Sequence, residues 1–417
     1  MDIPVQQSFL TDRSSAGGRL SNCIQVSQST LTKVMNNAAD SISEPDSLSS
    51  RLRLAISDRS SLRHLLGCLI GILVCVGVQM VQSASLTSRP SEQDTVFLGR
   101  HLAYLALSLG CAWIASKISA AWLQQNAFRL YILLLVLLIT LLIPGIGSRI
   151  NGAQRWLRFA GLSLQPSELG RIVMPVLAAS TLIRLRNTSG FRLTTVPATL
   201  LPVLIAAPLV AIEPDLGATV FLVTGYTLTL FLGGWPLRYF VACIFCVVPA
   251  AASLLILRPY QMQRISGFMD AWRDVSQAPW QVRQSLMSIG SGGLDGTGIG
   301  GGWQKLSYLP EANTDFVFAV IGEELGLLGT LAVCFVWIAV FLTGRSVLRH
   351  LPRTSFEWIL GTTLLVQLLL QAMANIAVVT ALVPPKGVPH PFISYGGTNL
   401  LVSLIAVGLI VGMSRRE

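Results

Sequence analysis

Charged side chains are scarce in this chain. Asp, Glu, Lys and Arg supply only 12% of its 417 residues, while 52% are hydrophobic and the mean hydropathy is +0.62. This balance is typical of an integral membrane protein and not of a water-soluble one. The net charge of +10 is spread over the segments between apolar runs. We therefore expect the charge to set topology and contact membrane lipids, and we expect no nucleic-acid partner.

Cysteine and histidine are sparse as well. Six of the seven cysteines lie in apolar runs and Cys23 lies in a polar N-terminal segment, so no disulfide framework is expected. The four histidines, at 64, 101, 350 and 390, show no metal-ligand spacing, and we predict no dedicated metal site. The first 62 residues also lack the apolar core of a cleavable signal peptide.

Residues 1–62 are polar and lack apolar periodicity, which predicts a disordered tail. Arginines cluster at the end of this tail, and the positive-inside rule then places the N-terminus in the cytoplasm. Residues 63–417 form one membrane domain, so the expected fold class is an all-α polytopic membrane protein with about ten transmembrane helices. With an even number of spans the C-terminus is cytoplasmic too, and 257–314 forms a large extracytoplasmic loop between helices seven and eight. The expected spans are 65–83, 97–116, 128–145, 168–184, 195–212, 216–233, 238–257, 315–343, 357–382 and 396–413.

Two segments that this topology places outside nevertheless carry cations. Arg155 and Arg158 lie in 146–167, and Arg264 and Lys305 lie in 257–314. Positive charge retained outside, against the usual bias, indicates an anionic ligand such as a phosphate. For the two arginines near Trp156, anchoring at the membrane interface is the alternative.

The stretch 285–329 organises the rest of the chain. A glycine-rich loop leads into a polar segment that ends in Thr314 and Asp315, and a long apolar run follows. Both residues suit a helix start, so Asp315 is either a functional ionisable group at headgroup level or a helix cap. Gly322 and Gly326 share its helix face, since each residue turns a helix by about 100°. Another helix can approach such small residues closely, which predicts that Asp315 faces the bundle.

Two acidic residues, Glu323 and Glu324, lie inside that apolar run. Burial in hydrocarbon is costly, so they require a polar cavity, protonation or a partner cation, and a structural ion pair is one alternative. The upstream glycines 296, 298 and 301 spell G-x-G-x-x-G, but no strand precedes them. This loop is therefore either flexible or a backbone nest that binds an anion.

Two further outer turns stand out. Glu213 and Asp215 flank Pro214 between two spans, where they serve either as turn and cap residues or in function. The segment 384–398 holds four prolines and three glycines. Such a composition predicts irregular backbone at membrane depth, which is tolerated only where it lines protein or a wet cavity.

Together these motifs resemble the SEDS family, which comprises FtsW, RodA and SpoVE. The resemblance covers roughly residues 63–413, in the order of the family's motifs, and the segments 305–312 and 385–387 are more similar to the division branch than to the elongation branch. The motifs that carry it are Asn151–Trp156, Gln165–Glu168, Pro214–Gly217, Pro259–Trp272, Lys305–Gly326 and Pro384–Gly397.

The resemblance implies a peptidoglycan glycosyltransferase that polymerises lipid II at the outer face of the bacterial cytoplasmic membrane during cell division. The implied partners are lipid II, a class B penicillin-binding protein transpeptidase, division-site proteins and membrane lipids. The family's catalytic aspartate falls on Asp315. Asn313 stands where the family usually has His, which puts any proton relay through that position in doubt, and Glu213 and Ala271 replace a frequent Gln and Pro.

The implied chemistry assigns roles to these residues. Asp315 is expected to accept the proton of the attacking sugar hydroxyl, and cations are expected to stabilise the departing lipid pyrophosphate. A divalent cation can assist Asp315, although no metal ligand set is expected. The residues expected to bind substrate are Arg155, Arg158, Arg264, Lys305, Glu311, Glu323 and Ser394.

Two other functions stay open from the residues alone. A lipid II flippase would need a polar path through the bilayer, which Glu323 and Glu324 could supply. A non-catalytic scaffold for a transpeptidase would need neither a base nor a path. The concentration of motifs in outer loops favours the enzyme, because a flippase should have comparable motifs in its inner loops.

Overall fold

The computed structural model describes residues 59–415 with gaps at 86–91, 146, 151–152, 160–161, 189, 214, 246–265, 267, 270–271, 273, 275, 277 and 307–308. Contacts divide the chain into Met1–Ser61 and Leu62–Glu417. The predicted tail lies almost wholly outside the described residues, as does most of the predicted seventh span, so the disorder of the tail stays a prediction.

Long apolar helices make up most of the described chain, which confirms the expected fold class. Nine of the ten predicted spans coincide with a helix, and the seventh begins as a helix over 237–245 before the described residues end. Within the described residues, six helices are long and apolar enough to cross a membrane, and α8 and α14 are shorter apolar helices. The helices are α3 (Arg59–Ser85), α4 (Glu92–Ala115), α5 (Ala120–Leu142), α6 (Pro166–Asn187), α7 (Val196–Ile212), α8 (Leu216–Leu232), α11 (Trp280–Gly292), α12 (Val317–Leu348), α13 (Phe356–Val379) and α14 (Gly397–Met413), with 3-10 turns η1 (Leu193–Thr195) and η3 (Gln304–Leu306).

Local sequence explains where several helices start. Ser119 caps α5 and Ser355 caps α13, each by accepting a hydrogen bond from a backbone N–H three residues later. Pro166 opens α6, where its missing N–H costs nothing. Large apolar side chains such as Trp113 and Phe335 are exposed on the bundle surface, as expected for faces in contact with lipid tails.

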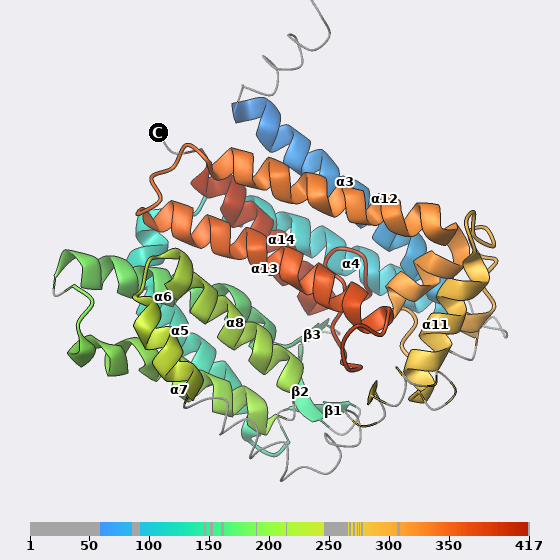
Figure 1. The fold of residues 1–417 in the computed structure, drawn as a ribbon, viewed down its shortest axis with the longest axis horizontal. Helices are drawn as coiled ribbons and strands as arrows, with labels where there is room; N and C mark the ends of the chain where they lie inside the picture. The colour runs from blue at the N-terminus through green and yellow to red at the C-terminus, as the bar shows by residue number, and fades with distance from the viewer. Residues whose placement is uncertain are drawn as a thin grey trace, which may run out of the picture. The chain divides into compact units, whose positions relative to one another are not determined.

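Helix α13 is central to the packing. It contacts α6, α8, α12 and α14, and Figure 1 shows α12, α13 and α14 running alongside one another with α5 to α8 next to them. Helices α4 and α14 approach closely at Gly408, where an added Cβ would lie 2.2 Å from the Ala112 carbonyl oxygen. Such close backbone contact is typical of membrane helices, where packing replaces the hydrophobic effect.

A small antiparallel sheet occupies 148–164, where we expected only a loop. Its strands β1 (Ser148–Ile150), β2 (Ala153–Phe159) and β3 (Leu162–Leu164) pair in that order. Two hairpins this short are not stable alone in water. The bundle stabilises them: the Ser163 N–H donates to the Tyr104 hydroxyl oxygen at 2.5 Å, and the Thr398 hydroxyl donates to the Ser163 carbonyl at 3.1 Å.

The predicted continuous span 315–343 is wrong in one respect. Helix α12 is interrupted at Gly326, whose φ of 63° and ψ of −162° are non-helical. Backbone of the glycine loop causes the break, because a Cβ on Gly326 would lie 2.4 Å from both the Gly296 nitrogen and the Leu294 oxygen. Gly322 likewise packs against Ile289 of α11. The predicted close approach at these two glycines is thus confirmed, and the approaching element is α11 with its following loop.

The contact between α11 and α12 predicts opposite effects for two neighbouring glycines. A Cβ on Gly292 would lie 1.9 Å from the Gly322 oxygen, while a Cβ on Gly290 meets nothing within 4 Å. Gly292→Ala should destabilise the protein by about 1–3 kcal/mol through overpacking. Gly290→Ala should leave stability unchanged or raise it by up to about 1 kcal/mol, since Ala favours helix. Thermal unfolding in detergent measures both, and equal unfolding temperatures would contradict the packing described.

Candidate active site

The glycine loop between α11 and α12 binds carboxylates of its own chain. Glu324 is fully buried and forms an ion pair with Lys305. The Ser83 hydroxyl donates to Glu324 at 2.6 Å, and the Gly300 N–H donates to it at 3.1 Å. The neighbouring Glu323 accepts the Trp303 N–H at 2.6 Å. The structural ion pair considered for these two acids is therefore confirmed for Glu324.

This arrangement changes the expectation for two predicted substrate-binding residues. The loop does form an anion-binding backbone nest, but its anions are the chain's own carboxylates. Lys305 is only 7% exposed and its ammonium group also contacts Ser83, so it is not available to an external phosphate. Glu323 is 2% exposed and accepts the Trp303 and Gln304 N–H groups. Both residues stabilise the loop in this structure and do not face a ligand.

A second cluster of charges forms where three connections meet. Asp215 caps α8 by accepting the Ala218 N–H at 2.9 Å, which confirms the helix-cap interpretation of this turn. Its other carboxylate oxygen accepts the Arg155 guanidinium of β2 at 3.1 Å and the Gln165 amide at 2.7 Å. One aspartate thus joins the small sheet to the start of α6 and to the turn before α8.

Asp315 lies at the same cluster. Helix α12 begins only after Phe316, and within the described residues no side chain caps its first turn, so the helix-cap interpretation of Asp315 is wrong. A Cβ on Gly387 would lie 2.7 Å from an Asp315 carboxylate oxygen. A Cβ on Gly217 would be 3.4 Å from both Asp215 and the Gly387 carbonyl. The Gly387 backbone therefore lies close to both aspartates. Any side chain at position 387 would overlap the Asp315 carboxyl, so this position requires glycine.

Burial and neighbouring charges shift the pKa of Asp315, Glu213 and Lys386. Burial raises the pKa of Asp315 to about 7, with Glu311 and Asp215 adding to the rise and Arg155 opposing it. Burial and Asp215 raise the pKa of Glu213 to about 8, again opposed by Arg155. Burial lowers the pKa of Lys386, which Asp215 partly offsets. A carboxyl with a pKa near neutrality can both accept and release a proton at physiological pH.

The proline-rich loop that leads to α14 brings Gly387 and Lys386 to this cluster. The loop reaches deep into the bundle, because a Cβ on Gly77 would lie 2.3 Å from the Phe392 oxygen. Gly77 is eight residues from the end of α3, or about 12 Å along the helix axis. This confirms the predicted irregular backbone lining protein at membrane depth. Figure 1 shows this loop, after α13, at the end of the bundle that carries the strands.

Of the four remaining predicted residues the structure describes three, and their surroundings differ. Ser394 is 1% exposed, and its hydroxyl accepts the His390 N–H at 2.7 Å, so it closes a turn within the loop and does not face a ligand. Glu311 is exposed beside Asp315 and has a positive φ of 55°, a strained conformation for a non-glycine residue. Arg158 is exposed on β2, and Arg264 lies outside the described residues.

Sequence reasoning missed several members of the cluster. Asp215 and Glu213 were visible as a turn, and Lys386 was part of a family-like motif, but none was assigned to a site. Gln165 was noted only as part of a motif. The one indication available was that all four lie in connections on the same predicted side of the membrane. Their side-chain contacts span up to about half the chain and have no local pattern.

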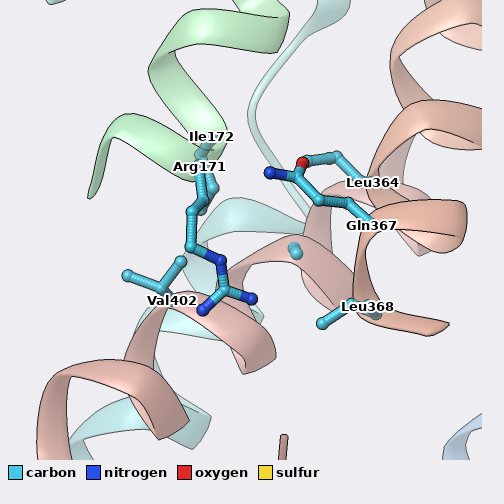
Figure 2. A pocket seen from close by; sticks show the side chains of 7 residues that line it. Arg171, Ile172, Leu364, Gln367, Leu368 and Val402 are labelled. Carbon is cyan, nitrogen blue, oxygen red and sulfur yellow. The ribbon is translucent and has the colours of Figure 1, made fainter. Parts of the chain in front are cut away.

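The described residues at the site include no metal ligand set. Among the described residues, no group of three or more His, Cys, Asp and Glu side chains could hold a metal ion. A small cavity lies elsewhere, between α6, α13 and α14, where Figure 2 shows Arg171 and Gln367 among apolar side chains such as Leu368 and Val402. Arg171 pairs with Glu168 at 2.5 Å, so this ionic pair belongs to the bundle interior and not to the cluster of Asp315.

Comparisons with known proteins agree with this architecture. The model of a family described as "Cell cycle protein", covering FtsW, RodA and SpoVE, matches residues 63–417. A probable peptidoglycan glycosyltransferase FtsW of Halorhodospira halophila is 37% identical over 365 residues, covering 84% of this chain and 90% of that protein. The corresponding protein of Coxiella burnetii is 37% identical over 345 residues, covering 81% and 92%.

Two solved structures are similar in fold. A chain of a peptidoglycan synthase complex, described for its coordination of polymerization and crosslinking, has a TM-score of 0.67 at 25% identity and covers 84% of this chain and 96% of that one. The rod shape determining protein RodA of Thermus thermophilus has a TM-score of 0.61 at 25% identity, covering 84% and 95%.

Glu213 generates a prediction about pH. Its folded-state pKa of about 8 lies above the ordinary value of 4.5, so between these values the folded protein holds a proton that the unfolded chain releases. The free energy of unfolding should then fall as pH rises through this window, by up to about 1.4 kcal/mol per pH unit. Glu213→Gln removes this term, so its unfolding temperature relative to the unmutated protein should rise from pH 5 to pH 8. A constant difference across that range would show that Glu213 is ionised in the folded state.

Proposed function

Since the chain belongs to the family of cell cycle proteins that includes FtsW, RodA and SpoVE, we propose that it is a peptidoglycan glycosyltransferase that acts in cell division. The observation that supports this function best is the Asp315 carboxyl, held against Gly387 among other charges with its pKa raised to about 7. A general base works best when its pKa is near the working pH.

The proposed substrate is lipid II, and the reaction forms one bond as another breaks. The sugar hydroxyl of the incoming lipid II attacks the anomeric carbon of the growing strand, and Asp315 accepts the hydroxyl proton. The bond between that carbon and the lipid pyrophosphate breaks, and its electrons leave with the pyrophosphate. The developing negative charge needs cations at that position.

Arg155 and Lys386 are the cations that the cluster offers for this purpose. Lys386 lies beside Asp215 and contacts the Leu216 carbonyl at 3.4 Å, so it replaces Lys305 in our assignment. Arg155 is paired with Asp215 and would exchange part of that contact for a phosphate. Arg158 and Arg264 stay predicted contributors, and assistance from a divalent cation stays a prediction.

The proposal includes an orientation and a partner. Arginines before the first span favour cytoplasmic termini, which would put the cluster at the outer face of the cytoplasmic membrane, where lipid-linked substrate and the wall are accessible. The similar chain from a complex that couples polymerization to crosslinking supports a transpeptidase of the penicillin-binding class as partner. Division-site proteins and membrane lipids complete the proposed surroundings.

The two other functions are less well supported. The flippase hypothesis required Glu323 and Glu324 to line a polar path through the bilayer, but both carboxylates are bound by the glycine loop. A passive scaffold would not need a half-buried carboxyl such as Asp315 with a pKa raised to about 7. The assay that separates the three functions is formation of glycan polymer from labelled lipid II by the purified protein.

The central prediction concerns Asp315→Asn. Asn has nearly the same size but cannot accept the proton, so polymerisation should fall by about 10²–10⁴-fold while the unfolding temperature is maintained. Asp295→Asn is the matched control, because Asp295 is an exposed carboxylate in the glycine loop, and its activity should equal that of the unmutated protein. Near-normal polymer yield with Asp315→Asn would remove the base role from this residue.

The pH dependence provides an independent check. With a pKa of about 7, Asp315 is mostly protonated at pH 6, so the rate there should be about one tenth of its plateau above pH 8. The measurement is the initial rate of lipid II polymerisation from pH 5 to pH 9 at substrate well below KM, where the rate reports the pKa of the free enzyme. A rate that is already constant above pH 5 would mean that the carboxyl is ionised at its ordinary pKa and is not the group that limits the reaction.

A further inference from the structure

Helix α13 carries a row of buried amides that hold other segments of the chain. Gln367, Gln371 and Asn375 are four residues apart and so lie on one helix face. Gln367 donates to the Phe221 carbonyl of α8 at 3.3 Å, and Gln371 donates to the Pro389 carbonyl at 2.8 Å. Gln371 thus supplies a donor to a carbonyl of the irregular loop, and Gln367 adds a contact to a carbonyl within helix α8.

Asn375 makes the most demanding of these contacts. Its Nδ2 donates to the Asp315 carbonyl at 2.7 Å and to the Val388 carbonyl at 2.6 Å. The two acceptors use both hydrogens of the amide, which fixes its orientation, because the flipped amide would place Oδ1 against two carbonyl oxygens. The residue is 0% exposed.

The two acceptors of Asn375 belong to the two segments that meet at the proposed base. One acceptor is the main-chain carbonyl of Asp315 itself. The other is the carbonyl of Val388, the residue after Gly387, and it is Gly387 that lies against the Asp315 carboxyl. We propose that Asn375 is a positioning residue for the reaction, whose amide holds the main chains of Asp315 and Val388 together and so keeps the Asp315 carboxyl against Gly387. This inference rests on the proposed function of Asp315.

Loss of the Asn375 amide should loosen this contact without removing any reacting group. The loop and the Asp315 segment keep another tie, since the Tyr395 N–H donates to the Asn313 carbonyl at 2.8 Å. A misplacement of about 1 Å in a catalytic group can lower the rate by about 10²-fold. A loosened carboxyl also gains water, so its pKa should move down toward the ordinary range.

The groups that surround the Asp315 carboxyl are unchanged by substitutions at Asn375. They come from its own segment, from β2, from the turn before α8 and from the loop after α13. The charged members are Glu311, Arg155, Asp215, Glu213 and Lys386. A shift in the pH profile of an Asn375 variant would therefore report a change in the environment of Asp315 and not the loss of a neighbouring charge.

The test compares two apolar near-isosteres on the same helix face, Asn375→Leu and Gln367→Met, in the full-length protein. For Asn375→Leu, kcat for lipid II polymerisation should fall roughly 10- to 100-fold with KM nearly unchanged, and the acid limb of the pH–rate profile should move to lower pH. Gln367→Met removes an amide with no contact to Asp315, so it should keep the kcat and the acid limb of the unmutated protein even if it unfolds at lower temperature.

A second variant covers failure of the first to fold. Asn375→Ala removes the same two hydrogen bonds without adding bulk or charge beside Asp315, so kcat should fall to a similar extent at pH 8. An unchanged kcat and acid limb in any folded Asn375 variant would overturn the inference. If instead the unmutated protein makes no polymer, or Asp315→Asn polymerises normally, the proposed function itself fails, and that result is recognised before any Asn375 variant is compared.

Discussion

The need to satisfy backbone polar groups away from water governs this structure. In a helix every interior N–H and C=O is paired within the segment, but the loop after α13 runs through the bundle without that pairing. Side-chain amides of α13 supply the missing donors at Val388 and Pro389. Because the loop is held in this way, Gly387 can lie beside Asp315, and the site exists only because an irregular segment is stable at that depth.

The same requirement explains the glycine loop, except that here the backbone supplies the donors and side chains supply the acceptors. There the buried groups are carboxylates, and backbone N–H groups of Gly300, Trp303 and Gln304 satisfy them together with Lys305. Glycine is required where the loop backbone meets α12 because a side chain at Gly296 or Gly326 would overlap main-chain atoms. The protein therefore has two irregular segments, one that depends on amide donors and one that itself serves as the donor.

Hydropathy predicted the helices well because spans of about twenty apolar residues have few alternatives in a membrane. It could not predict the sheet at 148–164, whose strands are short and depend on Tyr104 and Thr398 for support. The break at Gly326 was also missed, since its cause lies in a loop about thirty residues earlier in the chain. For the proposed site, family-like motifs pointed to Asp315 and Arg155, which the structure places in one cluster of charges. The assignment of Lys305 failed because its partner, Glu324, could not be recognised from charge alone.

The buried pair of Glu324 with Lys305 has a consequence for the assembly of the protein in the cell. Lys305, the donor glycines and Ser83 all precede Glu324 in the chain, so each has been synthesised before the acidic pair leaves the ribosome. A helix carrying two carboxylates would enter the bilayer poorly by itself. With these partners already made, the carboxylate of Glu324 can be paired when α12 enters the membrane, and the direction of synthesis matches the order in which the contacts are needed.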